Sequence, residues 1–152
     1  MVDAKTLKVT RHFDLGEKGN GPAGLAIDTK NKILFAMCRG GRGGTPTCVI
    51  LNAANGKIIT TLPLAGSSDG AVFNPRTMEA FSSHGNGTLS VIKEKSPTEF
   101  VLEETVKTKA GAKTCTLDAK TDHVIVITRE AAPGGGGQGG GSQLLDVMFI
   151  GR

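Results

Sequence analysis

Residues 24–62 read GLAIDTKNKILFAMCRGGRGGTPTCVILNAANGKIITTL, and this stretch decides the fold. Four short apolar runs lie within it, at residues 24–28, 33–37, 48–52 and 57–62. Polar or glycine-rich segments separate the runs. Apolar runs of this length, bounded by turn residues, are typical of β-strands. The stretch therefore predicts four short strands joined in sequence.

The same four-part phrase recurs along the chain at intervals of about 45 residues. A second copy has its runs at residues 70–74, 79–83, 88–92 and 100–106. A third copy begins at residues 114–118, continues through 123–127 and reaches 146–150. Four strands within about 40 to 50 residues are the sequence signature of a β-propeller blade. The sequence therefore predicts an all-β fold, a β-propeller with three four-stranded blades per chain.

The third copy lacks its fourth strand, and a phrase typical of that strand lies at the other end of the chain, in residues 8–15. Residues 3–8 match residues 52–57, which form the predicted turn into the fourth strand of the first copy. The blades are therefore expected to be circularly offset along the sequence. We expect a single half-propeller domain over residues 1–152, divided into an N-terminal blade-completing strand 1–16, blades 17–65 and 66–108, and an incomplete blade 109–152.

Three blades cannot close a ring, because propellers have roughly four to eight blades. An open arc would expose strand edges and apolar faces, which natural sheets pair or cover. Two copies related by a twofold axis remove both problems, and exchange of an identical strand is a known route to such dimers. We therefore predict a homodimer that completes a six-bladed ring, in which each N-terminal strand finishes the last blade of its partner.

The composition of the 152-residue chain limits the possible partners. It has six Phe and neither Trp nor Tyr, and its net charge of +4 is spread over turns and strand ends. Binding of single-stranded nucleic acid relies on aromatic stacking, so no nucleic-acid partner is expected. No run of about 18 apolar residues suggests a membrane span, and no signal-peptide pattern opens the sequence. A cytoplasmic location is expected on these grounds.

The loops differ between the two ends of the predicted strands. Tight turns that begin at Asp28, Asn74 and Asp118 join the first and second strands, and these three residues are interpreted as structural. Longer glycine-rich connections join the second and third strands, including the stretch 134–141, which is expected to be mobile. All the longer connections should emerge on one face of the ring, where propellers commonly carry their sites.

Several phrases of the sequence resemble the YncE-like or YVTN-repeat β-propellers of bacteria. They are residues 21–28, 69–75 and 87–92, which read GPAGLAID, DGAVFNP and GTLSVI. The resemblance covers nearly the whole chain and implies the fold, since the matching residues are strand and turn residues. Members of that family are usually about twice as long, secreted or periplasmic, and built as seven-bladed rings. The chain is similar to a C-terminal portion of such a protein.

Alignment of the repeats brings polar residues together at the mouth of the central channel. Asp69 and Lys113 occupy one equivalent position at the start of the first strand, and His84 lies at the end of the second strand. Histidine and carboxylate ligands suit zinc, manganese or iron. A divalent metal is therefore predicted, with His84 and Asp69 as ligands and with Lys113 and Glu130 as further catalytic residues.

Simpler interpretations of the same residues stay open. His84 can equally be a solvated loop residue in a His-Gly-Asn-Gly turn, and Asp69 can be the cap of a turn. Lys113 can be the counter-ion of Asp69. The sequence has no Ser-His-Asp order, nucleophile elbow or phosphate-binding glycine loop.

Two functions from different classes remain. The first is a metal-assisted hydrolase of esters, lactones or phosphotriesters, in which the metal polarises the small-molecule substrate and activates water. The alternative is a non-catalytic propeller module that binds a ligand or another protein.

Overall fold

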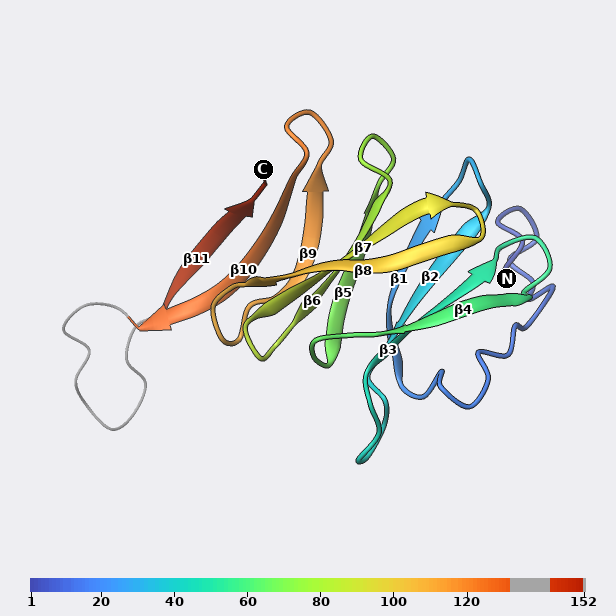
Figure 1. The fold of residues 1–152 in the computed structure, drawn as a ribbon, viewed down its shortest axis with the longest axis horizontal. Coiled ribbons are helices and arrows are strands. Elements are labelled where there is room, and N and C mark those ends of the chain that lie inside the picture. The colour runs from blue at the N-terminus through green and yellow to red at the C-terminus, as the bar shows by residue number, and fades with distance from the viewer. Residues whose placement is uncertain (132–142, 152) are drawn as a thin grey trace.

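The fold is known from a computed structural model that describes residues 1–131 and 143–151. These residues form three antiparallel sheets, which lie side by side (Figure 1). The all-β prediction is confirmed, and each sheet corresponds to one predicted repeat. Among the described residues there is no helix long and apolar enough to cross a membrane. The stretch 134–141, expected to be mobile, lies outside the described residues.

Each sheet keeps its strands in sequence order. The first sheet is β1 (Pro22–Asp28), β2 (Ile33–Cys38), β3 (Thr47–Asn52) and β4 (Ile58–Pro63). The second is β5 (Ser68–Asn74), β6 (Glu79–His84), β7 (Thr88–Ser96) and β8 (Glu99–Lys107). The third is β9 (Lys113–Asp118), β10 (His123–Ala131) and β11 (Gln143–Ile150). The third sheet has three strands, as the sequence predicted, and β1, β5 and β9 lie next to one another.

The first two strands of every sheet are joined by the same tight turn. The side chain of its first residue, Asp28, Asn74 or Asp118, accepts a hydrogen bond from the backbone N–H two residues later, at 2.8–3.0 Å. The residue four positions after it has a positive φ in all three turns, at 59°, 54° and 61°. The interpretation of these three residues as structural is confirmed, because their carboxylate or amide oxygens accept hydrogen bonds from backbone N–H groups within the turn.

An apolar seam, here called the first seam, joins the first and second sheets. Phe35 on β2 is fully buried, and its ring stacks on Phe73 with centroids 5.5 Å apart and meets the edge of Phe100 at 5.8 Å. Other buried members are Met37, Cys48, Ile50, Leu64, Ala80 and Ile92. Burial of apolar surface contributes about 25 cal/mol per Å², so this seam is a main source of stability.

A second seam joins the second and third sheets. Its buried side chains are Phe81, Leu89, Val91, Ala112, Val124 and Val126, and Met148 and Ile150 of β11 pack against them. Alternate residues of β10 and β11 point into this seam, as period-two strands require. The opposite face of the third sheet therefore carries the remaining residues of both strands.

The turn over residues 3–8 has the same hydrogen bonds as the turn over residues 52–57. In both, the side chain of the first residue, Asp3 or Asn52, accepts from the backbone N–H groups two and three residues later, at 2.8–3.2 Å. In both, the fifth residue has a positive φ and donates its N–H to the first carbonyl at 2.8 Å. The first N–H donates to the sixth carbonyl at 2.9 Å in each. The predicted match between these segments is confirmed.

The strand expected over residues 1–16 is not formed within the single chain. An isolated bridge joins Val2 to Val9, and Phe13 and Leu15 pack on the side of the first sheet turned away from the second. The physical reason is the lack of a neighbouring edge, because β11 lies at the opposite end of the molecule (Figure 1). Pairing of this segment with a second copy stays a prediction.

Replacement of Phe35 by Ala should destabilise the protein by about 3–5 kcal/mol, because the cavity would lie between two aromatic partners. Urea unfolding followed by circular dichroism measures the change. The exposed substitution Lys95→Ala is the control and should stay within about 0.5 kcal/mol of the parent. A Phe35→Ala protein as stable as this control would show that the first seam does not hold the sheets together.

Candidate functional site

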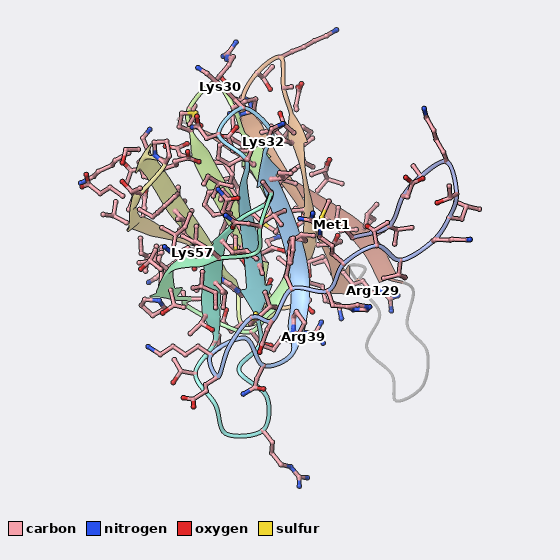
Figure 2. The ribbon with its side chains drawn as sticks, turned by 90° about the vertical axis from the view of Figure 1, so that its right-hand side faces the viewer. Met1, Lys30, Lys32, Arg39, Lys57 and Arg129 are labelled. Carbon is pink, nitrogen blue, oxygen red and sulfur yellow. The ribbon has the colours of Figure 1, made fainter. Side chains whose placement is uncertain are left out.

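The predicted site lies at the loop-rich rim, defined here as the end of the sheets that carries the β2–β3 and β6–β7 connections. Asp69 follows the first residue of β5, at a register shift between Ser68 and Gly70, and His84 ends β6 opposite Ser68. Arg39, just after β2, belongs to the same rim, at the end of the first sheet opposite to Lys30 (Figure 2). The structure thus places Asp69 and His84 on one sheet and at one rim, as the repeat alignment indicated.

Asp69 is held by Arg39 from the neighbouring sheet. The guanidinium donates to Asp69 Oδ1 at 2.9 Å and to the backbone carbonyl of Ser68 at 2.9 Å. Sequence reasoning suggested Lys113 as the counter-ion of Asp69, whereas Arg39 has this role. The repeat alignment missed Arg39 because it compares equivalent positions and does not show which side chains of adjacent sheets are in contact. These two hydrogen bonds, one to a carboxylate and one to a backbone carbonyl, join the first sheet to the second at this rim.

His84 is fully buried, so its interpretation as a solvated loop residue is wrong. Its Nε2 lies 2.9 Å from Ser90 Oγ, which also accepts a hydrogen bond from the backbone N–H of Ala65. Burial lowers the pKa of the imidazole, although the nearby backbone of Ser67 and the charge of Asp69 partly oppose this. The ring is therefore neutral near pH 7 and belongs to the packed interior of the second sheet.

A row of buried hydroxyl groups surrounds His84. Ser68, Ser82, Ser83 and Ser90 are all buried, and Ser82 Oγ donates to Ser68 Oγ at 3.0 Å. Serine in a strand is weak evidence for burial, so sequence patterns did not reveal this cluster. Ser82 and Ser68 satisfy each other's polarity in this way. Ser83 Oγ and His84 Nδ1, in contrast, are buried without a hydrogen-bond partner among the described residues.

Lys113 and Glu130 are exposed and belong to the third sheet. Glu130 accepts from Lys109 Nζ at 3.0 Å, and the same ammonium contacts Asp146. The carboxylate of Asp146, followed by that of Glu130, raises the pKa of Lys109. Glu130 thus has a structural partner of its own, which joins β10 and β11 to the preceding loop.

Another buried polar contact was missed at the opposite rim. Glu94 of β7 is 2% exposed and accepts a hydrogen bond from the Asn31 amide at 2.7 Å. Burial, with the nearby carboxylate of Asp28, raises the pKa of Glu94. The contact joins the β1–β2 turn to the second sheet, so the first two sheets are tied at both rims.

The described side chains do not form a donor set for a divalent metal. Within residues 1–131 and 143–151, no three His, Cys, Asp or Glu side chains come together as a group that could hold an ion. Asp69 is neutralised by Arg39, and Nε2 of His84 is engaged by Ser90 inside the sheet. The other ring nitrogen of His84, Nδ1, is buried without a hydrogen-bond partner among the described residues. The metal and hydrolysis predictions stay untested, and no chemical step is derived from them.

The comparisons with known proteins support the fold. No family model and no curated protein matches the sequence. The structure is similar to Kuenenia stuttgartiensis hydrazine synthase, with a TM-score of 0.70 and 16% identity, over 97% of this chain and 38% of that one. It is also similar to a chain of the mitotic checkpoint complex, with a TM-score of 0.57 and 16% identity, over 68% of this chain and 32% of that one.

Both neighbours contain β-propellers, and at this identity the similarity shows the fold alone. The chain is therefore a β-rich, propeller-like protein that spans about a third of the length of these two chains. Neither comparison names a YncE-like family, so that resemblance stays a prediction.

The buried imidazole should make stability depend on pH. The unfolded chain protonates histidine near pH 6.5, whereas folded His84 has a lowered pKa and resists the proton. The unfolded state therefore binds more protons, and the free energy of unfolding should fall as pH drops from about 6.5 toward the lower folded value. Urea titrations at pH 7.5 and pH 5.5 measure this.

His84→Gln should remove this part of the pH dependence, with a loss of about 1–3 kcal/mol at pH 7.5 from the disturbed hydrogen bond. His12→Gln, at an exposed position, is the matched control. An unchanged pH dependence in His84→Gln would contradict a neutral, buried His84.

Proposed function

We propose that the chain is a non-catalytic binding module whose partner is a second copy of itself, and that two copies complete a propeller ring. The observation that carries this proposal is the exposure, at both ends of the arc, of apolar positions whose equivalents pack in the seams. Exposed contiguous apolar surface on a small protein marks a protein interface.

The far face of the third sheet, defined as the side turned away from the second sheet, includes Val147 and Phe149. They are 42% and 65% exposed. Counted from the hairpin turns, their equivalents in β3 are Cys48 and Ile50, which are both 0% exposed in the first seam. Ile127 lies opposite Val147 on the same face and is 38% exposed. The far face of the third sheet thus has the apolar composition of a seam, but no neighbouring sheet of the described residues packs on it.

The far face of the first sheet, on the side away from the second sheet, has the complementary character. Leu25 and Ile27 of β1 are exposed, and their equivalents in β5, Ala71 and Phe73, pack in the first seam. A largely apolar groove of about 610 Å³ lies over this face. Its lining also includes Phe13, Leu15, Leu34, Ala36 and Leu51.

A twofold axis can bring each far face of one copy against the other far face of its partner. The two contacts are then identical, and the arc closes without a free end. Continuity with the existing seams favours this occupant, since both far faces repeat the residue positions that already pack sheet on sheet within the chain. Further blades of a longer chain, in place of a second copy, are the competing occupant that the experiment below detects.

Metal-assisted hydrolysis is the weaker candidate. Its two predicted ligands have protein partners in the single chain, and Lys113 and Glu130 belong to another sheet. Within residues 1–131 and 143–151, no third His, Cys, Asp or Glu side chain completes a metal site with the two predicted ligands.

The two far faces are tested by one charge placed on each. Phe149→Glu and Leu25→Glu should each weaken self-association at least tenfold, equivalent to about 1.4 kcal/mol or more, because a carboxylate would be buried in a seam. Sedimentation equilibrium at low micromolar concentration measures the dissociation constant. Lys30→Glu, at the exposed β1–β2 turn (Figure 2), is the matched control and should leave it unchanged.

A mixture of the two variants gives a sharper result. The Phe149→Glu copy keeps an intact first sheet, and the Leu25→Glu copy keeps an intact third sheet. The mixture should therefore form a heterodimer with one good contact, tighter than either variant with itself. A parent protein that stays monomeric at these concentrations would refute self-association, and it would favour further blades of a longer chain as the occupant.

The metal alternative has its own test. We expect treatment with a chelator to leave the association constant and the melting temperature of the parent protein unchanged. Elemental analysis of the protein before and after treatment provides the comparison. One tightly bound metal per chain, lost in both His84→Ala and Asp69→Asn, would overturn this expectation and support the hydrolase.

A further inference from the structure

We infer that the free edge of β11 is the acceptor site for a β-strand, and that residues 8–15 of a second copy occupy it. This inference rests on the proposed self-association and names the strand pairing within it. Its evidence comes from the N-terminal segment, the β11 edge and the cavity beside that edge.

The N-terminal segment already has the beginning of a fourth strand. The turn over residues 3–8 repeats four hydrogen bonds of the turn over residues 52–57 that leads into β4. The bridge between Val2 and Val9 stands where Leu51 pairs with Ile58. The chain therefore leaves this turn at Val9 as it leaves the equivalent turn at Ile58, where β4 begins.

The same segment also packs as a fourth strand does. Counted from the two turns, Phe13 and Leu15 are equivalent to Leu62 and Leu64. Leu62 and Leu64 pack in the first seam, against the sheet that follows their own. Phe13 and Leu15 pack on the first sheet beside Ile58 and Val49. The segment thus has the position of the last strand of a preceding sheet, already seated on the first sheet of its own chain.

The acceptor edge belongs to β11. This strand pairs with β10 from Gln143 to Ile150, and the described residues place no strand on its other side. Natural edges are usually protected by proline, lysine or a bulge, and β11, with the sequence QLLDVMFI, has none of these over its length. Its one charged side chain, Asp146, is held by Lys109.

Space for a fourth strand exists beside this edge. A cavity of about 480 Å³ lies between the second and third sheets, next to Ile150 and Gly151. Its other walls include Val91 of β7 and Val106 of β8. Fourth strands pack on each other in the complete pair of sheets, because β4 contacts β8. The cavity is therefore where a strand after β11 would approach β8.

The repeat fixes the register of the pairing. Cys48 lies opposite Leu62 between β3 and β4, and their equivalents are Val147 and Phe13. The two side chains also point to the same side. Phe13 packs on the first sheet of its own chain, and Val147 of the other copy lies on the far face that would pack against that first sheet. In the dimer, Ile150 of the partner would replace Val2 as the neighbour of Val9, so residues 1–2 would move aside.

A disulfide between copies tests this register. Directly opposite residues in a sheet have Cβ atoms about 4.5–5.5 Å apart, close to disulfide geometry. The double variant Phe13→Cys with Val147→Cys, oxidised by diamide, should give a covalent dimer on non-reducing gels. A disulfide within one chain would leave the mass on the gel unchanged. It is not expected, because the N-terminal segment and β11 lie at opposite ends of the molecule (Figure 1).

The parent protein and the shifted pair Arg11→Cys with Val147→Cys are the controls, and neither should cross-link efficiently. The parent protein is needed as a control because it has three free cysteines of its own. Cys38 and Cys48 are buried and Cys115 is half-buried, so these thiols should not cross-link. Hydrogen exchange provides a second measurement: the amides of β11 should be protected in the parent dimer and exchange faster in Phe149→Glu.

The outcomes separate the two proposals. A dimer in sedimentation with no cross-link in the predicted pair and no protection of β11 would overturn strand exchange but keep the proposed function. A monomer would overturn both. A cross-link that forms equally in the shifted pair would also contradict the inferred register.

Discussion

The structure depends on one constraint: a strongly twisted four-stranded sheet has two apolar faces, and both must be covered. Within the chain the constraint is met twice, at the seams around Phe35 and around Val124. Three sheets in a row leave two faces without a neighbouring sheet, although Phe13 and Leu15 cover part of the far face of the first sheet. Leu25 and Phe149 lie on those faces and are 64% and 65% exposed. The proposed assembly, the inferred pairing of the N-terminal segment and the proposed function all follow from covering them.

Much of the fold could be predicted from the sequence because the repeat supplies three copies of one pattern. The turns at Asp28, Asn74 and Asp118 mark the strand boundaries, and the offset between residues 3–8 and 52–57 is evident from the order of the amino acids alone. The state of residues 1–16 could not be predicted in the same way. A strand exists only with a partner edge, and local sequence does not tell whether that edge belongs to the same chain.

The candidate site was harder to predict, since repeat alignment gives position along a strand but not the neighbours of a side chain. It placed Asp69 and His84 correctly at one rim. It could not show that His84 points into a cluster of buried serines, or that Arg39 reaches across from the first sheet to Asp69. Such contacts depend on how adjacent sheets are rotated about each other. At this rim Arg39 thus joins the first sheet to the second, whereas His84 packs within the second sheet.

The central claim is that two chains close one ring, and small-angle X-ray scattering of the parent protein at low micromolar concentration tests it most directly. The account predicts the mass of two chains and a compact particle with a single-peaked distance distribution, whose profile agrees with that calculated for a closed six-bladed ring. A particle with the mass of one 15.7 kDa chain, or an open oligomer that lengthens with concentration, would contradict it.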